Sequence, residues 1–426
     1  MKPEEALEKI LEDRFRWIDI CYTDVIGNFK NLTLPSRKLS KSNFKEGIGN
    51  IDHESMFYAE GEHLILTPIS ETFAPVPWEP STARFIALSN NPSDPRNILS
   101  KAEKMFEKET KCQLKIGSEI DYYLLDTLIL TNEDKNVGIA IDSKEIGMNT
   151  YKGENENAMR RFQTVNGDIG RSIRMQASEY SEVMDVKINS HNHEKGKIQH
   201  EISLEKENVL KAADDYLTVK YATKNTSMVV GAIASFSPMI CDSEPPNKVH
   251  INMSAWNKNE NKFMSLEGEK LSDMGNYFTA GIIEHINSLS AFLLPSTLSY
   301  KKMSHIENIK VLNNIIRIPT PMFGEEDKRI EYRLADPSMN PYLGYSALIC
   351  AGLDGIKKKE TFDEKKVIRP PTNLTESLSS LMEDSEYLNK VFNSDFIHSY
   401  IELKEKEVKE KSSKVNLNEV TKYLNI

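Results

Sequence analysis

Residues 115–125 read Lys-Ile-Gly-Ser-Glu-Ile-Asp-Tyr-Tyr-Leu-Leu, a stretch in which polar and apolar side chains alternate. Successive side chains of a β-strand point to opposite faces of its sheet. As a strand, this stretch places Glu119 and Asp121 on one face, while Ile120 and Tyr122 point to the other. Taken alone, such an acidic pair more often marks a solvated strand face than a pair of metal ligands.

Further segments repeat this pattern. Residues 249–254 put His250 and Asn252 on one face, and residues 329–333 put Glu331 between two arginines. Hard divalent cations prefer carboxylate and imidazole ligands, and arginine suits phosphate. The combination predicts a site for a divalent metal and a nucleotide. A fourth segment, residues 193–202, adds two more carboxylates. The candidate metal ligands are then Glu119, Asp121, Glu194, Glu201, His250 and Glu331.

The composition is that of a soluble globular protein, with 426 residues of which 39% are hydrophobic and 28% are charged. The net charge of −10 comes from mixed acidic and basic residues, which disfavours nucleic acid as a partner. Residues 1–5 lack the apolar core of a signal peptide and no run is long enough to span a bilayer, so we expect no membrane partner. The four cysteines are far apart and predict reduced thiols in a cytoplasmic protein.

Two domains are expected from the pattern along the chain. Turn residues and short apolar runs punctuate the first hundred residues. The prolines at 68, 75, 77 and 80 argue against helix there and for a small sheet-rich unit. A helical pattern near residue 98 then leads into the strand at 115–125, and this places a boundary near residue 95. We therefore expect one domain over residues 1–95 and a larger one over 96–426.

The larger part alternates strands with long helices. Apolar spacing predicts helices over 209–221 and 277–294. Pro341 opens a third predicted helix that runs to about residue 357, because the missing N–H of proline costs little in a first helical turn.

The order of these segments resembles the glutamine synthetase family, in its type I-like branch. Residues 329–343 read Arg-Ile-Glu-Tyr-Arg-Leu-Ala-Asp-Pro-Ser-Met-Asn-Pro-Tyr-Leu and carry the most specific similarity. The pattern G-x-E-x-[ED]-[FY]-[FY] at 117–123 and the acidic residues of 193–202 add to it. The resemblance runs over nearly the whole chain. It implies an α+β fold, with a small N-terminal β-grasp-like domain and a larger catalytic domain whose curved antiparallel sheet is flanked by helices.

The resemblance also implies two divalent ions per subunit, either Mg²⁺ or Mn²⁺. In the family, such ions help to transfer the γ-phosphoryl group of ATP to a glutamate carboxylate, and ammonia then attacks the acyl phosphate. Asp121 stands where the family usually has glutamate. The expected ligands are Asp121, Glu194 and Glu201 for the ion nearer the substrate, and Glu119, His250 and Glu331 for the ion beside the nucleotide phosphates.

Other site residues follow from the resemblance by position. Asp52 is either the aspartate that activates ammonia or a turn residue. The remaining assignments are Arg317 and Arg333 for catalysis, Ser254, Arg317 and Arg329 for ATP, and Lys302, Arg333 and Arg161 for the substrate.

Departures from the family pattern are concentrated on the side of the amino acid and ammonia. Pro245 and Pro246 replace a flexible glycine-containing loop and remove two backbone donors. Lys302 and Leu312 stand where arginines are expected, and lysine lacks the bidentate fork of arginine. Arg161 stands where a tyrosine would help to bind ammonium, and a cation there would repel one.

Two classes of function follow. The first is an ATP-dependent carboxylate–amine ligase that joins a glutamate-like carboxylate to ammonia or, more in keeping with the departures, to an organic amine. The second is a non-catalytic homologue that binds metal and nucleotide in a regulatory or structural role. In both, the resemblance implies self-association into rings, as a dodecamer of two hexamers, with each site between subunits.

Overall fold

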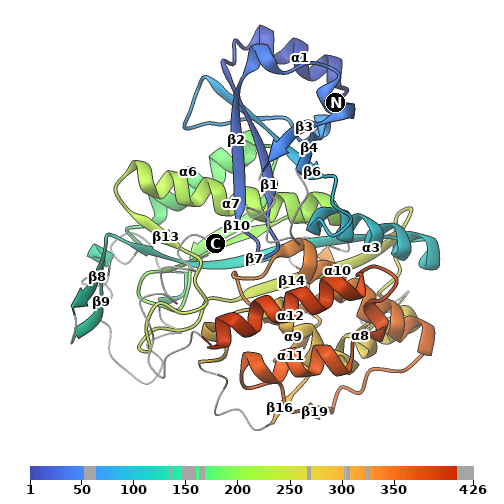
Figure 1. Ribbon diagram of the computed structural model, residues 1–426. Helices are drawn as coiled ribbons and strands as arrows, with labels where there is room; N and C mark the ends of the chain where they lie inside the picture. Colours follow the sequence, from blue (N-terminus) through green and yellow to red (C-terminus); the bar gives the residue numbers. More distant parts are fainter. Residues whose placement is uncertain are drawn as a thin grey trace.

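The computed structural model describes residues 1–51, 64–133, 136–145, 160–162, 168–265, 270–301, 303, 308–321, 324 and 327–409. A small N-terminal sheet stands above a larger body of sheet and helices (Figure 1). Within the described ranges, every helix is too short or too polar to cross a membrane.

The N-terminal sheet has the strand order β2-β1-β6-β4-β3, and β5 pairs with β6. Strands β1 and β6 run parallel, whereas β1 pairs with β2 and β4 with β6 in antiparallel fashion. Helix α1 (Pro3–Glu12) buries Ala6 and Ile10 against the apolar side of this sheet, so the unit has its own core. The strands are β1 (Trp17–Thr23), β2 (Phe29–Pro35), β3 (Ile48–Ile51), β4 (Leu64–Pro68), β5 (Ala74–Pro75) and β6 (Thr82–Ser89).

The larger sheet is antiparallel throughout, with the order β10-β11-β7-β14-β18-β17. Its central strand β7 is flanked by β11 and β14, and it also pairs with the short strands β12 and β13. The strands are β7 (Gln113–Leu125), β10 (Ile188–His193), β11 (Gln199–Leu204), β12 (Glu207–Asn208), β13 (Ile233–Ser235), β14 (Val249–Asn257), β15 (Glu260–Asn261), β17 (Ile316–Arg317) and β18 (Ile330–Ala335).

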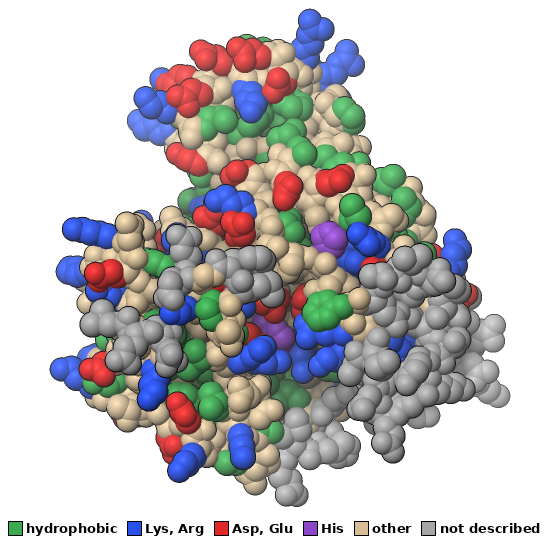
Figure 2. Space-filling model, turned by 180° about the vertical axis from the view of Figure 1, so that it is seen from behind, with side chains coloured by type: hydrophobic (Ala, Val, Ile, Leu, Met, Phe, Trp, Pro, Cys, Tyr) green, Lys and Arg blue, Asp and Glu red, His purple; other side chains and the backbone are tan. Residues whose placement is uncertain are grey.

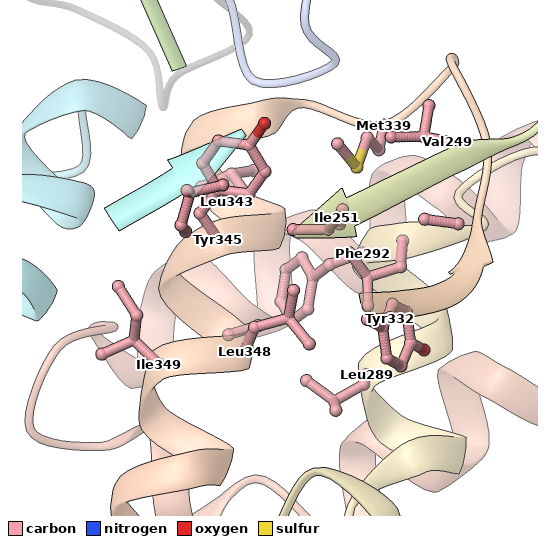
Figure 3. Packing of buried hydrophobic residues seen from close by; sticks show 14 of the residues in the cluster. Val249, Ile251, Leu289, Phe292, Tyr332, Met339, Leu343, Tyr345, Leu348 and Ile349 are labelled. Carbon is pink, nitrogen blue, oxygen red and sulfur yellow. The ribbon is translucent and has the colours of Figure 1, made fainter. Parts of the chain in front are cut away.

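One face of this sheet forms the main hydrophobic core. Val249 and Ile251 of β14 and Tyr332 of β18 pack against helices α9 and α10, where Phe292 and Leu348 lie (Figure 3). Because side chains alternate along a strand, burying these residues turns their sequence neighbours to the opposite face. His250 and Glu331 are two of those neighbours.

The helices agree largely with the sequence pattern. The predicted helix over 209–221 extends to residue 229, and the one over 277–294 is broken at His285 into α8 and α9. Asn340 caps α10 by accepting a hydrogen bond from the Tyr342 N–H at 3.0 Å. The helices are α3 (Pro95–Thr110), α6 (Arg171–Val183), α7 (Val209–Val229), α8 (Asp273–Glu284), α9 (Ile286–Leu293), α10 (Pro341–Lys358), α11 (Leu374–Glu383) and α12 (Ser394–Lys409), with the short α2 (Asn43–Glu46) in the N-terminal part.

Two further strand pairs lie outside these sheets. Strands β8 (Thr127–Glu133) and β9 (Asn136–Asp142) form a hairpin, and β16 (Ile309–Lys310) pairs with β19 (Val367–Ile368).

The turn after β1 docks on the start of α10. The Asn340 side chain donates to the carbonyl oxygens of Asp24 and Val25 at 3.0 and 3.2 Å. Gly27 in this turn has φ of +96°, and a Cβ there would lie 3.2 Å from Asn340 Cα. A glycine is therefore required where the N-terminal unit meets the larger one.

Candidate metal and nucleotide site

Three adjacent strands bring Glu119, His250 and Glu331 together. His250 of β14 lies opposite Glu119 of β7, and Asn252 lies opposite Glu331 of β18. His250 Nδ1 is 3.0 Å from Glu119 Oε2 and 3.7 Å from Glu331 Oε1. Residues from three parts of the sequence thus meet on one face of the sheet, as the alternation predicts.

Two atoms of this cluster are suited to a metal ion. His250 Nε2 and Glu331 Oε1 are buried and lack a hydrogen-bond partner among the described residues, although Glu331 is only 2% exposed. Buried polar atoms nearly always have a hydrogen-bond partner, so ligand-type atoms without one indicate a place suited to a cation, although Glu331 Oε1 also has Arg333 Nε at 3.4 Å. Glu194 Oε1, in the second predicted ligand set, is a further such atom. The residues therefore fit one divalent ion.

The carboxylate of Glu119 is held ionised. Burial raises the pKa of Glu119, but the hydrogen bond and charge of His250, with smaller effects of Asn252 and Arg329, outweigh burial and lower this pKa to about 2. Asn252 Nδ2 donates to Glu119 Oε1 at 3.1 Å, and Arg329 Nε donates to Asn252 Oδ1 at 2.9 Å. Asn252 thus connects a predicted metal ligand to a predicted phosphate-binding arginine. It shares a strand face with His250 in the sequence pattern, but that pattern assigned it no role.

The second predicted ligand set lies one strand further along. Glu201 of β11 faces Asp121 of β7, and Glu194 follows the end of β10, where its N–H closes the hairpin by donating to the Gln199 carbonyl at 2.7 Å. Burial, followed by neighbouring carboxylates, raises the pKa of both Asp121 and Glu201 well above the usual range. Glu119, Glu201 and His250 can each present a ligand atom within 4.8 Å of the other two, so the two sets form one continuous acidic cluster.

Arg161 enters this second set. Its Nε lies 2.6 Å from Glu194 Oε1, and one terminal nitrogen lies 3.8 Å from Glu201 Oε2. A guanidinium therefore contacts two of the three carboxylates that the sequence assigns to the ion nearer the substrate. The described geometry does not fit a second divalent ion at that place, and the second ion stays a prediction from the sequence.

The two arginines predicted to bind ATP, Arg317 and Arg329, and the predicted catalytic and substrate-binding Arg333 border the first set. Arg333 Nε is 3.4 Å from Glu331 Oε1, and a terminal nitrogen of Arg317 is 3.8 Å from Glu331 Oε2. A terminal nitrogen of Arg329 is 4.0 Å from Glu119 Oε1. One face of the molecule shows acidic and histidine side chains among lysines and arginines near its middle (Figure 2). Such a mixture suits a metal ion together with phosphate.

Ser254 lies on the same strand face but farther away. It is four residues beyond His250, about 13 Å along an extended strand. Its hydroxyl is buried and accepts a hydrogen bond from the Trp256 indole at 2.8 Å. Its assignment to ATP stays a prediction. Asp52 and Lys302 lie outside the described residues.

The loop of Pro245 and Pro246 is anchored through its carbonyl groups. Tyr123 Oη donates to the Pro245 carbonyl at 2.6 Å, and Gln199 Nε2 donates to the Pro246 carbonyl at 3.2 Å. Two prolines and two side-chain hydrogen bonds make this a fixed turn beside the acidic cluster.

A buried polar network behind β10 and β11 was not anticipated. Arg174 makes two hydrogen bonds of 2.9 Å with Asp168 and one of 2.7 Å with His200. Glu145 lies 3.1 Å from His200 and 3.7 Å from His193. His193 and His200 are the direct neighbours of Glu194 and Glu201, so this network supports the strand ends that carry those carboxylates. Each of these histidines directly precedes a predicted acidic ligand in the sequence, and from this pattern the network could have been predicted.

Fold and site together define a protein with an antiparallel sheet whose acidic, arginine-bordered face is suited to a divalent ion and phosphate. The family model "Glutamine synthetase, catalytic domain" matches residues 92–423. The chain belongs to the glutamine synthetase family.

Individual relatives are similar to this chain over nearly all of their length. The chain is 30% identical to a glutamine synthetase of Sulfolobus acidocaldarius, over 99% of this chain and 98% of that protein. It is likewise 30% identical to one of Pyrococcus furiosus, with 97% of each chain covered. The cryo-electron microscopy structure of Plasmodium falciparum glutamine synthetase superposes with a TM-score of 0.86 over 99% of both chains, at 20% identity, which shows the shared α+β fold.

Proposed function

We propose that this protein is an ATP-dependent carboxylate–amine ligase that uses Mg²⁺ or Mn²⁺. Family membership supports ligase chemistry in general. The observation that carries the proposal is the cluster of Glu119, His250 and Glu331, with its two buried and unsatisfied ligand atoms. A divalent ion held there would offset negative charge on the phosphates of ATP.

The proposed reaction activates a glutamate-like carboxylate as an acyl phosphate, which an amine then attacks. Arg317, Arg329 and Arg333 border the metal cluster and would hold phosphate oxygens as the γ-phosphoryl group moves. Asp52 would assist the attacking amine, and Lys302 would hold a substrate carboxylate.

The amine is proposed to be organic rather than ammonia. Ammonium is attracted to a site by unpaired carboxylates, but Arg161 already neutralises Glu194 at 2.6 Å. The rigid turn at Pro245 and Pro246 also removes backbone donors beside the site. Both features alter the acceptor side and leave the metal cluster intact.

The test is ATP-dependent phosphate release by the purified protein with Mg²⁺ or Mn²⁺. Glutamate is supplied with ammonium and then with alkyl, aryl and polyamine acceptors. Release that requires one acceptor, and that is lost in Glu331→Gln but kept in Glu383→Gln, supports the proposal. Glu383 is exposed on α11, so its variant controls for loss of a carboxylate as such. Release that persists in Glu331→Gln contradicts it, because a contaminating enzyme would then be the source.

The alternative is a non-catalytic homologue with a regulatory or structural role. Leu312, in place of an expected arginine, favours it, since this side chain packs against the hydrophobic core. If the protein retains its metal and binds ATP but releases no phosphate with any acceptor, this alternative is supported.

The domains over 1–95 and 96–426 and the ring of two hexamers are also proposed. Met228, Val229 and Val230 at the end of α7 are 66%, 69% and 61% exposed, and such a contiguous apolar patch supports self-association. Light scattering gives the mass of the particle. A monomeric mass at assay concentration contradicts the ring.

A further inference from the structure

The backbone fixes Arg161 beside the acidic cluster. The N–H of Phe162 donates to the carbonyl oxygen of His193 at 3.0 Å. Phe162 adopts a φ of +63°, which is uncommon for an aromatic residue. Because His193 precedes Glu194, this hydrogen bond holds Arg161 next to that carboxylate. The guanidinium also lies over the Phe162 ring, with its central carbon 4.9 Å from the ring centroid.

Both oxygens of Glu194 are engaged. Oε1 forms an ion pair with Arg161 Nε at 2.6 Å, although the contact lacks hydrogen-bond geometry. Oε2 accepts the Lys195 N–H at 3.0 Å. Mg²⁺ binds carboxylate oxygens at roughly 2.0–2.1 Å. The guanidinium nitrogen, 2.6 Å from Oε1, lies slightly farther away than such an ion would, but it carries a positive charge of its own and lies on an oxygen that the ion would need.

Three other predicted ligands converge on one place, which Glu331 borders with its Oε1 3.7 Å from His250 Nδ1. Glu119 and His250 belong to the predicted nucleotide-side set and Glu201 to the other set, yet their ligand atoms lie within 4.8 Å of one another. Glu201 Oε2 is 3.8 Å from Arg161, so the same carboxylate connects the guanidinium to this place. The geometry is that of one ion position flanked by one fixed organic cation.

We propose that the Arg161 guanidinium replaces the second divalent ion, so that each subunit binds one ion instead of two. This rests on the proposed function, which supplies the ion at Glu119, His250 and Glu331. Arg161 offsets the charge of Glu194 and Glu201 in the way that a metal would, but it is covalently attached and offers only N–H donors. Arg161 is therefore a positioning residue that determines metal stoichiometry.

The test is the number of Mn²⁺ ions bound per chain, measured by equilibrium dialysis or by titration followed by electron paramagnetic resonance. We expect one ion for the unaltered protein, two for Arg161→Gln, and one for the control Arg37→Gln, which removes an exposed arginine of the N-terminal part. Glutamine is neutral and shorter, so it frees Glu194 and Glu201 for an ion.

Each other outcome has a definite meaning. Two ions in the unaltered protein overturn the inference, because Arg161 then moves aside for metal, and they leave the proposed function intact. One ion in Arg161→Gln also overturns it, because the guanidinium is then not what excludes the second ion. No ion in either protein overturns the proposed function itself.

A second measurement covers the case in which Arg161→Gln is too unstable for dialysis. Without metal, the variant leaves Glu194 and Glu201 unneutralised and its Tm falls below that of the unaltered protein. Saturating Mn²⁺ then raises Tm more in Arg161→Gln than in the unaltered protein, because it gains a second bound ion. Equal shifts in the two proteins overturn the inference.

Discussion

Asn252 donates its side-chain N–H to Glu119 Oε1 at 3.1 Å, across the pairing of β14 with β7. The other end of the same amide accepts from Arg329 Nε at 2.9 Å. Asn252 therefore orients a proposed metal ligand and a proposed phosphate-binding residue at once. Such outer contacts commonly tune metal affinity as much as they tune geometry.

Replacing Asn252 by leucine, which has a similar shape, removes both hydrogen bonds. We expect Mn²⁺ affinity to fall about 10–100-fold, because the Glu119 carboxylate loses its orienting donor. Isothermal titration measures the change. Asn314→Leu, at an exposed asparagine, serves as the control. Unchanged affinity in Asn252→Leu would show that His250 alone orients Glu119.

The ion pair of Arg174 with Asp168 is predicted to stabilise the fold. Both side chains are 3% exposed, and their two hydrogen bonds measure 2.9 Å. Arg174→Met leaves a buried carboxylate without its partner, so we expect a loss of about 3–5 kcal/mol in the free energy of unfolding. Chemical denaturation followed by circular dichroism measures it. The double variant with Asp168→Leu should recover part of the loss, and a double variant as unstable as the single one contradicts this explanation.

His285, at the junction of α8 and α9, predicts a pH dependence of stability. Its Nδ1 is 2.8 Å from Asp384 and its Nε2 is 3.0 Å from Asp354. Burial lowers the pKa of His285, but the two aspartates, with Glu284 nearby, outweigh burial and raise it above the ordinary value of 6.5. Lys358 also pairs with Asp354 and Glu284, and it stays charged across the relevant range because its own pKa is raised.

The direction of this pH dependence follows from the raised pKa of His285 in the folded state. The stabilisation by protonated His285 is complete below 6.5 and is lost as pH rises through the raised folded value. The pKa values of Asp354 and Asp384 are lowered, so their contribution is lost only as pH falls well into the acidic range. We expect the Tm difference between the unaltered protein and His285→Gln to shrink as pH rises above 6.5. A difference that stays constant across this range contradicts the prediction.

Gly281 marks the closest approach of α8 and α10. A Cβ on Gly281 would lie 2.2 Å from the Ala351 carbonyl oxygen and 2.6 Å from the Gly355 nitrogen. A change from glycine to alanine inside a helix normally stabilises by up to about 1 kcal/mol. Here the backbones must separate, so we expect Gly281→Ala to destabilise by about 1–3 kcal/mol. Thermal unfolding shows whether Gly281→Ala is less stable than the unaltered protein. A Tm equal to or above that of the unaltered protein contradicts the close packing.

Much of the site could be predicted because it lies on strands. The period of two in 115–125 and 249–254 correctly placed Glu119 and His250 on one face, since a strand leaves its side chains no other choice. Family resemblance then connected these strands in the right order. The break at His285 was missed because apolar spacing continues across it, and the His285 interactions with Asp354 and Asp384 arise from distant segments.

Which side chains share a face within each strand, and that a helix opens at Pro341, could be predicted from the order of amino acids because both follow from local backbone geometry. The contact of Arg161 with Glu194, and the pairing of Arg174 with both Asp168 and His200, arise only in the folded chain. Arg161 follows no periodic pattern, and its position depends on a backbone hydrogen bond from Phe162 to a strand some thirty residues away. Electrostatic pairing acts through space, so its partners become known only when the chain is folded.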